Sequence, residues 1–469
     1  MIQDNRAAEI AAQLRARIAE LPAGTRLPGV RALSSEFSAS AATVSAALAQ
    51  LTALGLMRAE PGRGTFVLDR STQREPDFTW QTQALGGARI DPDRAARLGG
   101  YGGADHLPLS WGYLAPELTP AEELQRIAAR AGKHQRAWAM TPPTGSPELR
   151  RVLAAPYRAD PSEVLVTAGG QQALVFAMRT LAEPGATLIT ESPSYPGAIL
   201  AAQSSGLRLA PVPSDADGIL VDRLEDELRR TGARLVYLQP GFANPTGATL
   251  SPERRARVLE LAAAYGAFII EDDWARHLGI DAPTPPPLFT AAPDGHVVSV
   301  LTLAKPASPG LRLGALVARG PAAARLRASR TAEDLGVAPL VQETALGLLT
   351  SSAWPRHLAR LAPALAERRD ALLAALAESV PAVRVVSVPR GGLHVWARLP
   401  LDADTGAVCA AADAAGVLVG NGAHFFVDEP PAAHLRFSYG AGTPAQFAEG
   451  ARRLGALLAG APTHALKEP

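Results

Sequence analysis

Lys305 is the residue of this sequence whose type and position most clearly suggest chemistry. The chain holds only three lysines among its 46 lysine and arginine residues, and Lys305 follows the apolar run "VVSVLTLA" just before a turn rich in proline and glycine. A lysine amine at the end of a buried strand can form a Schiff base with a carbonyl cofactor. A lone lysine is more often an exposed charge, so the residues that accompany Lys305 must decide between these interpretations.

Polar motifs accompany two further apolar runs that have the length of strands. "NPTG", at 244–247, comes shortly after "ARLVYLQP", and "EDD", at 271–273, follows "AFII". Arg312 lies seven residues after Lys305. Ligands of α/β sheets bind at the carboxyl ends of the strands, so we expect these residues to converge on one crevice. Each motif also has a purely structural interpretation, since "NPTG" is a common turn and "EDD" can be a solvated acidic edge.

The elements that would position these residues form an α/β pattern. From about residue 160, short apolar runs alternate with helical patterns, as where "EVLVTAG" precedes "QQALVFAMRTLA" and "ARLVYLQP" precedes "SPERRARVLELAAAYG". This alternation predicts a mostly parallel sheet covered by helices. After about residue 320 the pattern changes to long helices and then to a smaller α+β part that contains "RVVSVP", "LHVWARLP" and "HLRFSYG".

The first 70 residues have a different pattern. Apolar residues at helical spacing predict three helices, marked by Ile10, Leu14 and Ile18, by Leu27, Val30, Leu33 and Phe37, and by Val44, Leu48 and Leu51. The runs "LMRAE" and "TFVL" on either side of "PGRG" predict a β-hairpin. Residues 71–105 show weak periodicity and three pairs of glycines, which favours a linker. We therefore expect domains at 1–70 and 106–469, joined by 71–105.

Three helices and a hairpin are the arrangement of a winged helix-turn-helix domain. The segment from "GTRLP" through "TV" to "GRGTFV" resembles the GntR family along its whole length. This resemblance implies that the third helix enters the major groove of DNA, with the hairpin as the wing. It implies contacts from Arg31, Thr43 and Arg63. The chain departs from the family pattern at Gly29, where a serine is usual, and at Ala41, where an arginine is common.

The expected DNA contacts are dispersed, because the third helix carries no charge. Residues 1–70 hold eight arginines and six acidic residues, a net charge of +2. We expect contacts to phosphates from Arg26, Arg31, Arg58 and Arg63, and contacts to bases from Ser40 and Thr43. A winged helix that serves only protein contacts is the alternative.

Residues 110–460 resemble the fold-type I aminotransferases. The order asparagine, aspartate, lysine, arginine, followed late in the chain by "LRFSYG", carries the resemblance. It implies that pyridoxal 5'-phosphate is the cofactor and that Lys305 forms the Schiff base. Asp272 would keep the pyridine nitrogen protonated, Asn244 would donate to the 3-oxygen of the ring, and Tyr195 would stack on the ring face.

The same resemblance implies a site for the phosphate and a site for a ligand. The phosphate would lie at the start of the helix after "EVLVTAGG", on the backbone N–H groups of Gly170 and Gln171. Thr302 and Arg312 would complete this phosphate site. Arg436, in "LRFSYG", would bind a carboxylate through two hydrogen bonds.

A GntR-like domain followed by an aminotransferase-like domain is similar to the layout of the MocR family of bacterial regulators. Two departures concern the chemistry. Trp274 stands where the family commonly has a tyrosine, and an indole N–H can only donate. Met140 stands where aminotransferases often have a tyrosine that reaches the phosphate of the partner subunit.

Composition limits the classes of protein that remain. The 469 residues carry a net charge of +1, so DNA affinity must come from a local patch. The single cysteine, Cys409, allows no intrachain disulfide and fits a reducing compartment. The uncharged run 37–57 contains too many serines and threonines for a membrane span. We expect a cytoplasmic protein with no membrane segment and no metal site.

Three functions fit these residues. The first is a homodimeric transcription regulator that binds a double-stranded operator and senses an amine, an amino acid or pyridoxal phosphate through the Lys305 Schiff base. The second is a working aminotransferase with an appended DNA-binding domain. The third is a degenerate fold that only mediates dimerisation, which the joint presence of Lys305, Asp272, Asn244 and Arg312 disfavours. We expect transamination to be absent or slow.

Overall fold

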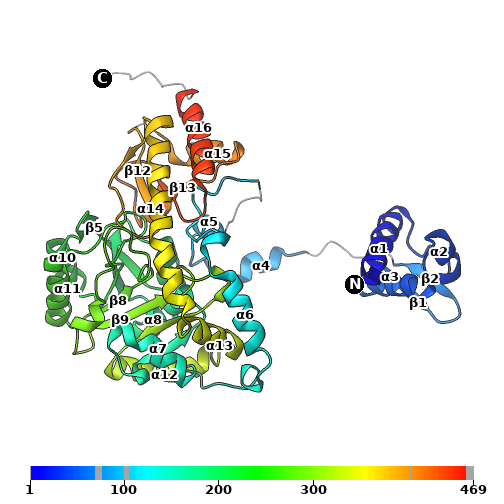
Figure 1. The fold of residues 1–469 in the computed structure, drawn as a ribbon, viewed down its shortest axis with the longest axis horizontal. Coiled ribbons are helices and arrows are strands. Elements are labelled where there is room, and N and C mark those ends of the chain that lie inside the picture. The colour runs from blue at the N-terminus through cyan, green and yellow to red at the C-terminus, as the bar shows by residue number, and fades with distance from the viewer. Residues whose placement is uncertain (1, 69–76, 100–104, 402, 461–469) are drawn as a thin grey trace. The chain divides into compact units, whose positions relative to one another are not determined.

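The structure is a computed structural model of the chain, and it describes residues 2–68, 77–99, 105–401 and 403–460 (Figure 1). The chain divides into two compact units, Met1–Gly87 and Ala88–Pro469.

The N-terminal unit has the predicted order of three helices and a hairpin. Its elements are α1 (Ile2–Glu20), α2 (Val30–Glu36), α3 (Ala41–Ala53), β1 (Met57–Glu60) and β2 (Gly64–Val67), followed by the short helix α4 (Thr79–Ala84). The apolar residues at helical spacing pack together, since Ile10 and Leu14 of α1 share one core with Val44 and Leu51 of α3. Gly55 follows α3 with φ +66°, a left-handed conformation that costs glycine little. The predicted winged helix fold is confirmed.

An eight-stranded sheet forms the centre of the second unit. Its strand order is β3-β10-β9-β8-β7-β4-β5-β6, and the neighbours among β9, β8, β7, β4 and β5 are parallel. β10 is antiparallel to both β3 and β9, and β6 is antiparallel to β5. The strands are β3 (Val164–Thr167), β4 (Thr187–Ser192), β5 (Arg208–Asp215), β6 (Gly218–Ile219), β7 (Leu235–Leu238), β8 (Phe268–Asp272), β9 (Val297–Thr302) and β10 (Gly314–Val317).

Helices cover both faces of this sheet, which explains its continuous apolar strands. Alternate residues of β7 and β8 enter different cores: Val236 and Ile269 pack on one face, Leu235 and Ile270 on the other. The second face is covered by α8 (Gly170–Leu181), α9 (Pro196–Ser204) and α12 (Gly320–Glu333). The first face is covered by α6 (Ala121–Ala131), α7 (Pro147–Ala154), α10 (Val221–Thr231), α11 (Pro252–Tyr265) and α13 (Pro339–Leu349).

A smaller α+β part follows, as the sequence predicted. It contains a four-stranded antiparallel sheet of order β11-β12-β14-β13 with three helices. These elements are α14 (Ala353–Ser379), β11 (Arg384–Val385), β12 (His394–Arg398), α15 (Thr405–Ala414), β13 (Gly420–Asn421), β14 (His434–Ser438) and α16 (Pro444–Gly460). The long helix α14 begins in the core of the large sheet with Trp354 and continues in the core of the small one with Leu365 and Leu372 (Figure 1).

The range 71–105 contains helical structure that the sequence analysis did not predict. Besides α4, it holds α5 (Pro92–Gly99), which belongs to the second unit and packs against α9. Residues 69–76 and 100–104 lie outside the described residues. None of the described helices combines the length and the apolar composition that crossing a membrane requires.

Candidate functional site

Asp272 is the last residue of β8, and its carboxylate is buried in a small hydrogen-bond network. The Tyr237 hydroxyl donates to Asp272 Oδ2 at 2.7 Å, and Gln239 Nε2 donates to the same oxygen at 2.8 Å. Burial raises the pKa of Asp272, while these hydrogen bonds and the positive charge of Lys305 oppose the rise. The carboxylate is therefore held in one orientation by neutral donors.

The three acidic residues at the end of β8 point to different sides of the sheet. Asp272 shares its face with α8, because side chains alternate along a strand. Glu271 lies on the opposite face, where it accepts from the Ser299 hydroxyl, and Asp273 accepts from the Tyr157 hydroxyl at 2.7 Å. Only Asp272 thus lies on the same face as the start of α8.

Lys305 lies three residues beyond the end of β9, not at the strand end as the sequence suggested, because the strand stops at Thr302. Its Nζ donates to the carbonyl oxygen of Gly112 at 2.7 Å and lies 3.7 Å from the centroid of the Tyr113 ring. Burial, with the nearby charge of Arg436, lowers the pKa of Lys305 to about 7. A substantial fraction of this amine is therefore neutral and nucleophilic near neutral pH.

Four residues meet at the start of α8. Gly169 has φ +96°, and a Cβ placed there would lie 2.8 Å from Arg312 Nη2. A Cβ on Gly170 would lie 3.4 Å from Thr302 Cβ. Arg312 Nη2 also donates to the Ala168 carbonyl at 3.2 Å. Because the first N–H groups of a helix lack partners within it, this arrangement is suited to an anion.

Tyr195 lies at the start of α9, beside the residues at the start of α8. Its hydroxyl donates to Gln171 Oε1 at 3.2 Å, and Gln171 Nε2 donates to the Gly197 carbonyl at 2.7 Å. Burial raises the pKa of Tyr195, so the phenol stays neutral. The structure thus brings Tyr195 and Gln171 together with the residues at the start of α8.

Arg436 joins the small sheet to the crevice. Its Nη2 donates to the Ser110 carbonyl at 2.6 Å, and its Nη1 donates to Asn244 Oδ1 at 3.2 Å. Nε is buried without a partner among the described residues. Burial lowers the pKa of Arg436 to about 10, so the group is still a cation near neutral pH. A desolvated guanidinium that faces only neutral acceptors is suited to binding a carboxylate.

Trp274 and His394 form a stacked pair in the same crevice, with ring centroids 5.5 Å apart. Trp274 Nε1 and His394 Nδ1 are both buried without a partner among the described residues. A Cβ on Gly112 would lie 3.5 Å from His394 Nε2 and 3.9 Å from Lys305 Nζ, so both side chains border the same space. Burial and the charges of Arg436 and Lys305 lower the pKa of His394 well below its ordinary value.

The sequence analysis missed several residues of this crevice. Tyr237 and Gln239 occupy alternate positions of "YLQ", directly before the predicted strand end, and that period of two was a usable signal. Gly112 and Tyr113 lie in "SWGYLAP", before the sheet begins, and His394 follows a glycine pair. No local pattern connects these three residues to Lys305.

Met140 lies away from the crevice of its own chain. It is 89% exposed, beside Trp138, which is 70% exposed. The predicted role of this position at a partner subunit's phosphate stays a prediction.

In the N-terminal unit, Ser40 and Thr43 lie at the start of α3. Ser40 is the N-cap residue, and its hydroxyl oxygen accepts from the Thr43 backbone N–H at 3.1 Å. The two hydroxyls also share a hydrogen bond of 2.8 Å. Ser40 therefore has a structural task that the sequence analysis did not assign, and Thr43 is the freer of the two for base contacts.

The predicted phosphate-binding arginines are exposed, but two of them are paired. Arg58 and Arg63 both pair with Glu60 within the wing, at 2.6 and 2.8 Å. Exposed pairs of this kind contribute little stability, so a phosphate could displace the carboxylate. Arg26 lies against the wing at Gly64, and Arg31 lies near the start of α2. Gly29 provides no side-chain cap for that helix.

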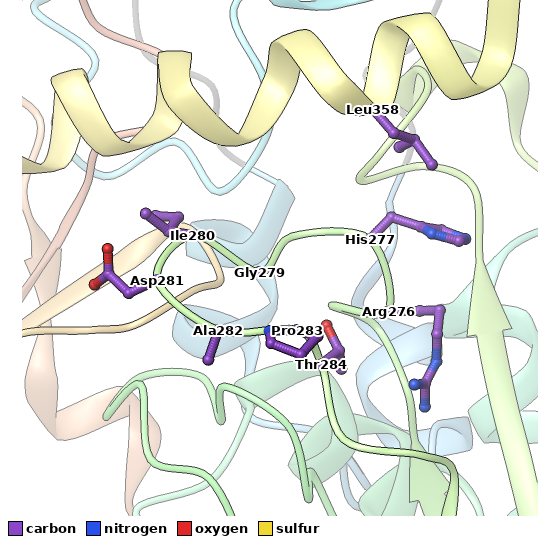
Figure 2. A pocket seen from close by; sticks show the side chains of 9 residues that line it. All are labelled: Arg276, His277, Gly279, Ile280, Asp281, Ala282, Pro283, Thr284 and Leu358. Atoms are coloured by element: carbon purple, nitrogen blue, oxygen red, sulfur yellow. The ribbon is translucent and has the colours of Figure 1, made fainter.

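A separate surface cavity is lined mainly by the loop that follows β8 (Figure 2). Arg276, His277 and Asp281 line it together with Leu358 of α14. Arg276 is already paired with Asp273 at 2.6 Å. The cavity contains none of the residues predicted for the cofactor or the ligand.

Comparison with known proteins identifies both units. The family of bacterial regulatory proteins named gntR matches residues 6–67, and the family aminotransferase class I and II matches residues 112–454. The uncharacterized HTH-type transcriptional regulator YdfD of Bacillus subtilis is 28% identical over 94% of this chain and 93% of its own length. The chain belongs to the MocR family. Its second unit is an aminotransferase class I and II domain.

Enzymes share this second unit. The 2-aminoadipate transaminase of Thermus thermophilus is 33% identical to the MocR-family chain over 76% of this chain and 90% of its own length. The crystal structure of LysN, an α-aminoadipate aminotransferase of that organism complexed with N-(5'-phosphopyridoxyl)-L-leucine, has a TM-score of 0.76. It is 33% identical and covers 81% of this chain and 98% of its own.

The cofactor of this MocR-family protein is pyridoxal 5'-phosphate. The crevice fits it on structural grounds, because polar atoms of Trp274, His394 and Arg436 are buried there with no partner in the part of the chain that the structure describes. A side chain at position 169 would fill the space beside Arg312. Because the residue is Gly169, that space stays open for an anion at the start of α8. The donors match the phosphate, and the Asp272 carboxylate matches a pyridine N–H.

When bound, pyridoxal phosphate supplies an aldehyde that reacts with amines and a ring that withdraws electrons. The residues of this MocR-family chain would provide the rest. The Lys305 amine is neutral in part of the molecules and can then act as a nucleophile. Asp272 would hold a proton at the pyridine nitrogen. Arg436 would orient a ligand by its carboxylate. The carbonyl of Gly112 and the ring of Tyr113 contact the Lys305 amine and would hold it in position.

Proposed function

We propose that this protein is a DNA-binding transcription regulator that senses an amine or an amino acid in its pyridoxal phosphate crevice. It would bind a double-stranded operator as a homodimer. A protein that regulates transcription works where the chromosome is, which places it in the bacterial cytoplasm. The proposed residues are those of the crevice for the effector, and Arg26, Arg31, Thr43, Arg58 and Arg63 for DNA.

One observation carries the sensing proposal. Lys305, which would hold the cofactor, and Arg436, which would bind a carboxylate, border the same crevice, and the charge of Arg436 lowers the pKa of Lys305. An amino acid carries both groups that this pair would recognise, an amine and a carboxylate. Since the same chain carries a GntR-type domain, binding of an amino acid in the crevice would be able to control DNA binding.

The signal would arise from competition between two amines. An amino acid that displaces Lys305 from the cofactor frees the lysine amine and places a carboxylate on Arg436. Such a ligand shifts a conformational equilibrium only if it binds one state more tightly than the other. The contacts of Arg436 with Ser110 and Asn244 would differ between those states, because a carboxylate would compete for the same N–H groups.

An active aminotransferase with an appended DNA-binding domain is the second candidate. The identity of 33% with a 2-aminoadipate transaminase favours it, together with the joint presence of Lys305, Asp272, Asn244 and Arg436. Sustained turnover of an amino donor and a keto acid distinguishes the two candidates, because a sensor needs only one exchange of amines.

The test of the proposed function measures DNA binding and absorbance on the same protein. The purified protein should show the absorbance of bound pyridoxal phosphate, and the Lys305→Ala variant should lose the link that borohydride reduces. Wild-type protein should bind the DNA upstream of its own gene more tightly than random DNA, and an amino acid that changes the absorbance should change that affinity. Equal affinity for both DNAs would rule out a specific regulator.

A further inference from the structure

The segment that ends η7 (Gly422–Phe425) lies between the ligand crevice and the helix α5. On the crevice side, the guanidinium of Arg436 lies 5.1 Å from the centroid of the Phe425 ring. The Phe425 carbonyl also accepts from the backbone N–H of Ser194 at 2.7 Å, one residue before Tyr195. Phe425 therefore contacts both the proposed carboxylate site and the start of α9.

The other end of this segment is bound by a buried arginine of α5. Arg94 Nη2 donates to the Phe426 carbonyl at 2.9 Å, across 332 residues of sequence. Arg94 is only 8% exposed, and its Nε is buried without a partner among the described residues. Burial lowers the pKa of Arg94, and Asp91 opposes this only by its charge.

Attaching α5 through this contact carries a high desolvation cost. A buried guanidinium needs an ion-pair partner to offset its desolvation, and no carboxylate within the described ranges lies at ion-pair distance from Arg94. An apolar side chain would attach α5 to the cluster of Trp396, Phe425 and Phe426 at lower cost. The hydrogen bond of Arg94 only partly offsets the desolvation of its guanidinium, so a small displacement of Phe426 can break this contact.

The position of α5 in the chain makes this contact relevant to DNA binding. The second unit begins at Ala88, and α5 starts at Pro92, so α5 is its first helix after the DNA-binding unit. Whatever holds or releases α5 alters the length of free chain between the DNA-binding unit and the first anchored point of the second unit. The distance that a connecting segment can span depends on that length.

We propose that Arg94 is a latch through which the ligand crevice controls the connection to the DNA-binding unit. This inference rests on the proposed function, since it requires that a ligand carboxylate engages Arg436. That engagement moves the guanidinium relative to Phe425 and shifts the Phe425–Phe426 backbone. The shift changes the Arg94 hydrogen bond and with it the attachment of α5.

The latch implies a reciprocal coupling, because linkage between two binding sites acts in both directions. DNA upstream of the gene should change the amino acid concentration that gives half of the absorbance change, by about fivefold or more in the wild-type protein. In Arg94→Met, which keeps the bulk of the side chain and removes the donors, this factor should fall to near one. The absorbance of the bound cofactor without amino acid should be unchanged, because Arg94 touches neither cofactor nor ligand.

The experiment uses the full chain loaded with pyridoxal phosphate. The probes are the common L-amino acids and L-2-aminoadipate, and the one with the largest absorbance change in wild-type protein is titrated with and without DNA. Arg89→Met is the matched control, since Arg89 is an exposed arginine shortly before α5. Arg94→Lys restores one donor and should regain part of the coupling, which excludes a loss through misfolding.

The outcomes separate the two proposals. Coupling that survives in Arg94→Met, or that is lost equally in Arg89→Met, would overturn the latch and leave the sensor proposal intact. A wild-type protein that changes its absorbance with amino acids while its DNA affinity stays constant would overturn the proposed function, and the latch with it.

Discussion

The amine of Lys305 is distinguished from that of an ordinary lysine by its surroundings. It is partly buried, it points at a carbonyl oxygen and an aromatic ring, and Arg436 contributes a positive charge nearby. Burial and the charge of Arg436 disfavour the ammonium form, whereas the carbonyl oxygen and the aromatic ring favour it. The residue is therefore prepared for attack on an aldehyde at neutral pH.

This environment predicts a pH dependence for cofactor binding. Because the pKa of Lys305 is lowered to about 7, the rate at which cofactor-free protein acquires the absorbance of bound pyridoxal phosphate should rise with a midpoint near pH 7 and then level off. An ordinary lysine would keep accelerating towards pH 10. Pyridoxal, which lacks the phosphate, is the control aldehyde. A rate that is still rising steeply at pH 9 would contradict the prediction.

Arg436 should decide which ligands are sensed. The Arg436→Ala variant should keep the absorbance of the bound cofactor and lose most of its response to amino acids, since a charge-assisted pair worth about 1.5 to 3 kcal/mol is removed. Its response to simple amines should change less. Titration of both ligand classes measures this, with Arg384→Ala, an exposed arginine of β11, as control. An equal loss for amines and amino acids would exclude a carboxylate site.

The helices contribute their ends rather than their faces. The start of α8 offers N–H groups to an anion only because Gly169 adopts φ +96°, which brings the chain close to Arg312. The start of α3 is capped by Ser40, which leaves the exposed positions of that helix for DNA. In both units a local backbone feature at a helix start creates the proposed binding surface.

Replacing Gly169 by alanine should weaken binding of pyridoxal phosphate. The positive φ costs a non-glycine residue about 1 to 3 kcal/mol, and the new Cβ would displace the Arg312 guanidinium. We expect the affinity to fall by about tenfold or more. Gly232→Ala is the control: Gly232 also has a positive φ, +62°, with nothing within 4 Å of its Cβ position, and it lies away from the residues of the site. Titration of cofactor-free protein and thermal unfolding measure both effects.

Arg31 and Thr43 should affect DNA binding in different ways. Arg31→Ala should weaken binding to all sequences and reduce the salt dependence by about one counterion. Thr43→Ala should change the preferred base while the helix stays capped, because Ser40 accepts from the backbone N–H that alanine keeps. Binding to a randomised set of half-sites at several salt concentrations checks both, with Arg15→Ala on α1 as control. A uniform loss for Thr43→Ala would assign it to positioning.

At the scale of the whole molecule, the chain combines an enzyme fold with a DNA-binding unit. The crevice contains the residues proposed to bind an amine and a carboxylate, whereas Trp274 stacks on His394 and provides no phenol. Met140 likewise provides none on the exposed surface. This combination suits ligand exchange better than a complete catalytic cycle.

We therefore expect no multiple-turnover transamination, or turnover well below about 1 per second. Single-turnover formation of keto acid and sustained production can be measured in one assay with excess amino donor and acceptor. Mixing pyridoxal phosphate and substrates without protein gives the background. Sustained production at a rate typical of enzymes would favour the aminotransferase as the primary function.

The amino-acid sequence predicted two domains with the folds that the structure shows, and it pointed to several residues that the structure brings together in the crevice. Helical and strand periodicities are local, and the motifs around Asn244, Asp272 and Lys305 follow predicted strands whose carboxyl ends meet at one edge. The role of Ser40 as the N-cap of α3 could also have been predicted from local sequence, but Ser40 was assigned to base contacts instead. The linker range was predicted from weak periodicity, which hides a helix as short as α5.

Only the tertiary structure decided which distant side chains complete the crevice. Gly112 lies 193 residues before Lys305, and Arg94 lies 332 residues before Phe426, so no spacing rule relates them. Their contacts arise because two sheets and the long helix α14 pack into a fixed arrangement. Packing of this kind depends on the whole chain, and it also produces the burial that lowers the pKa of Lys305 and places the guanidinium of Arg94 against the Phe426 carbonyl.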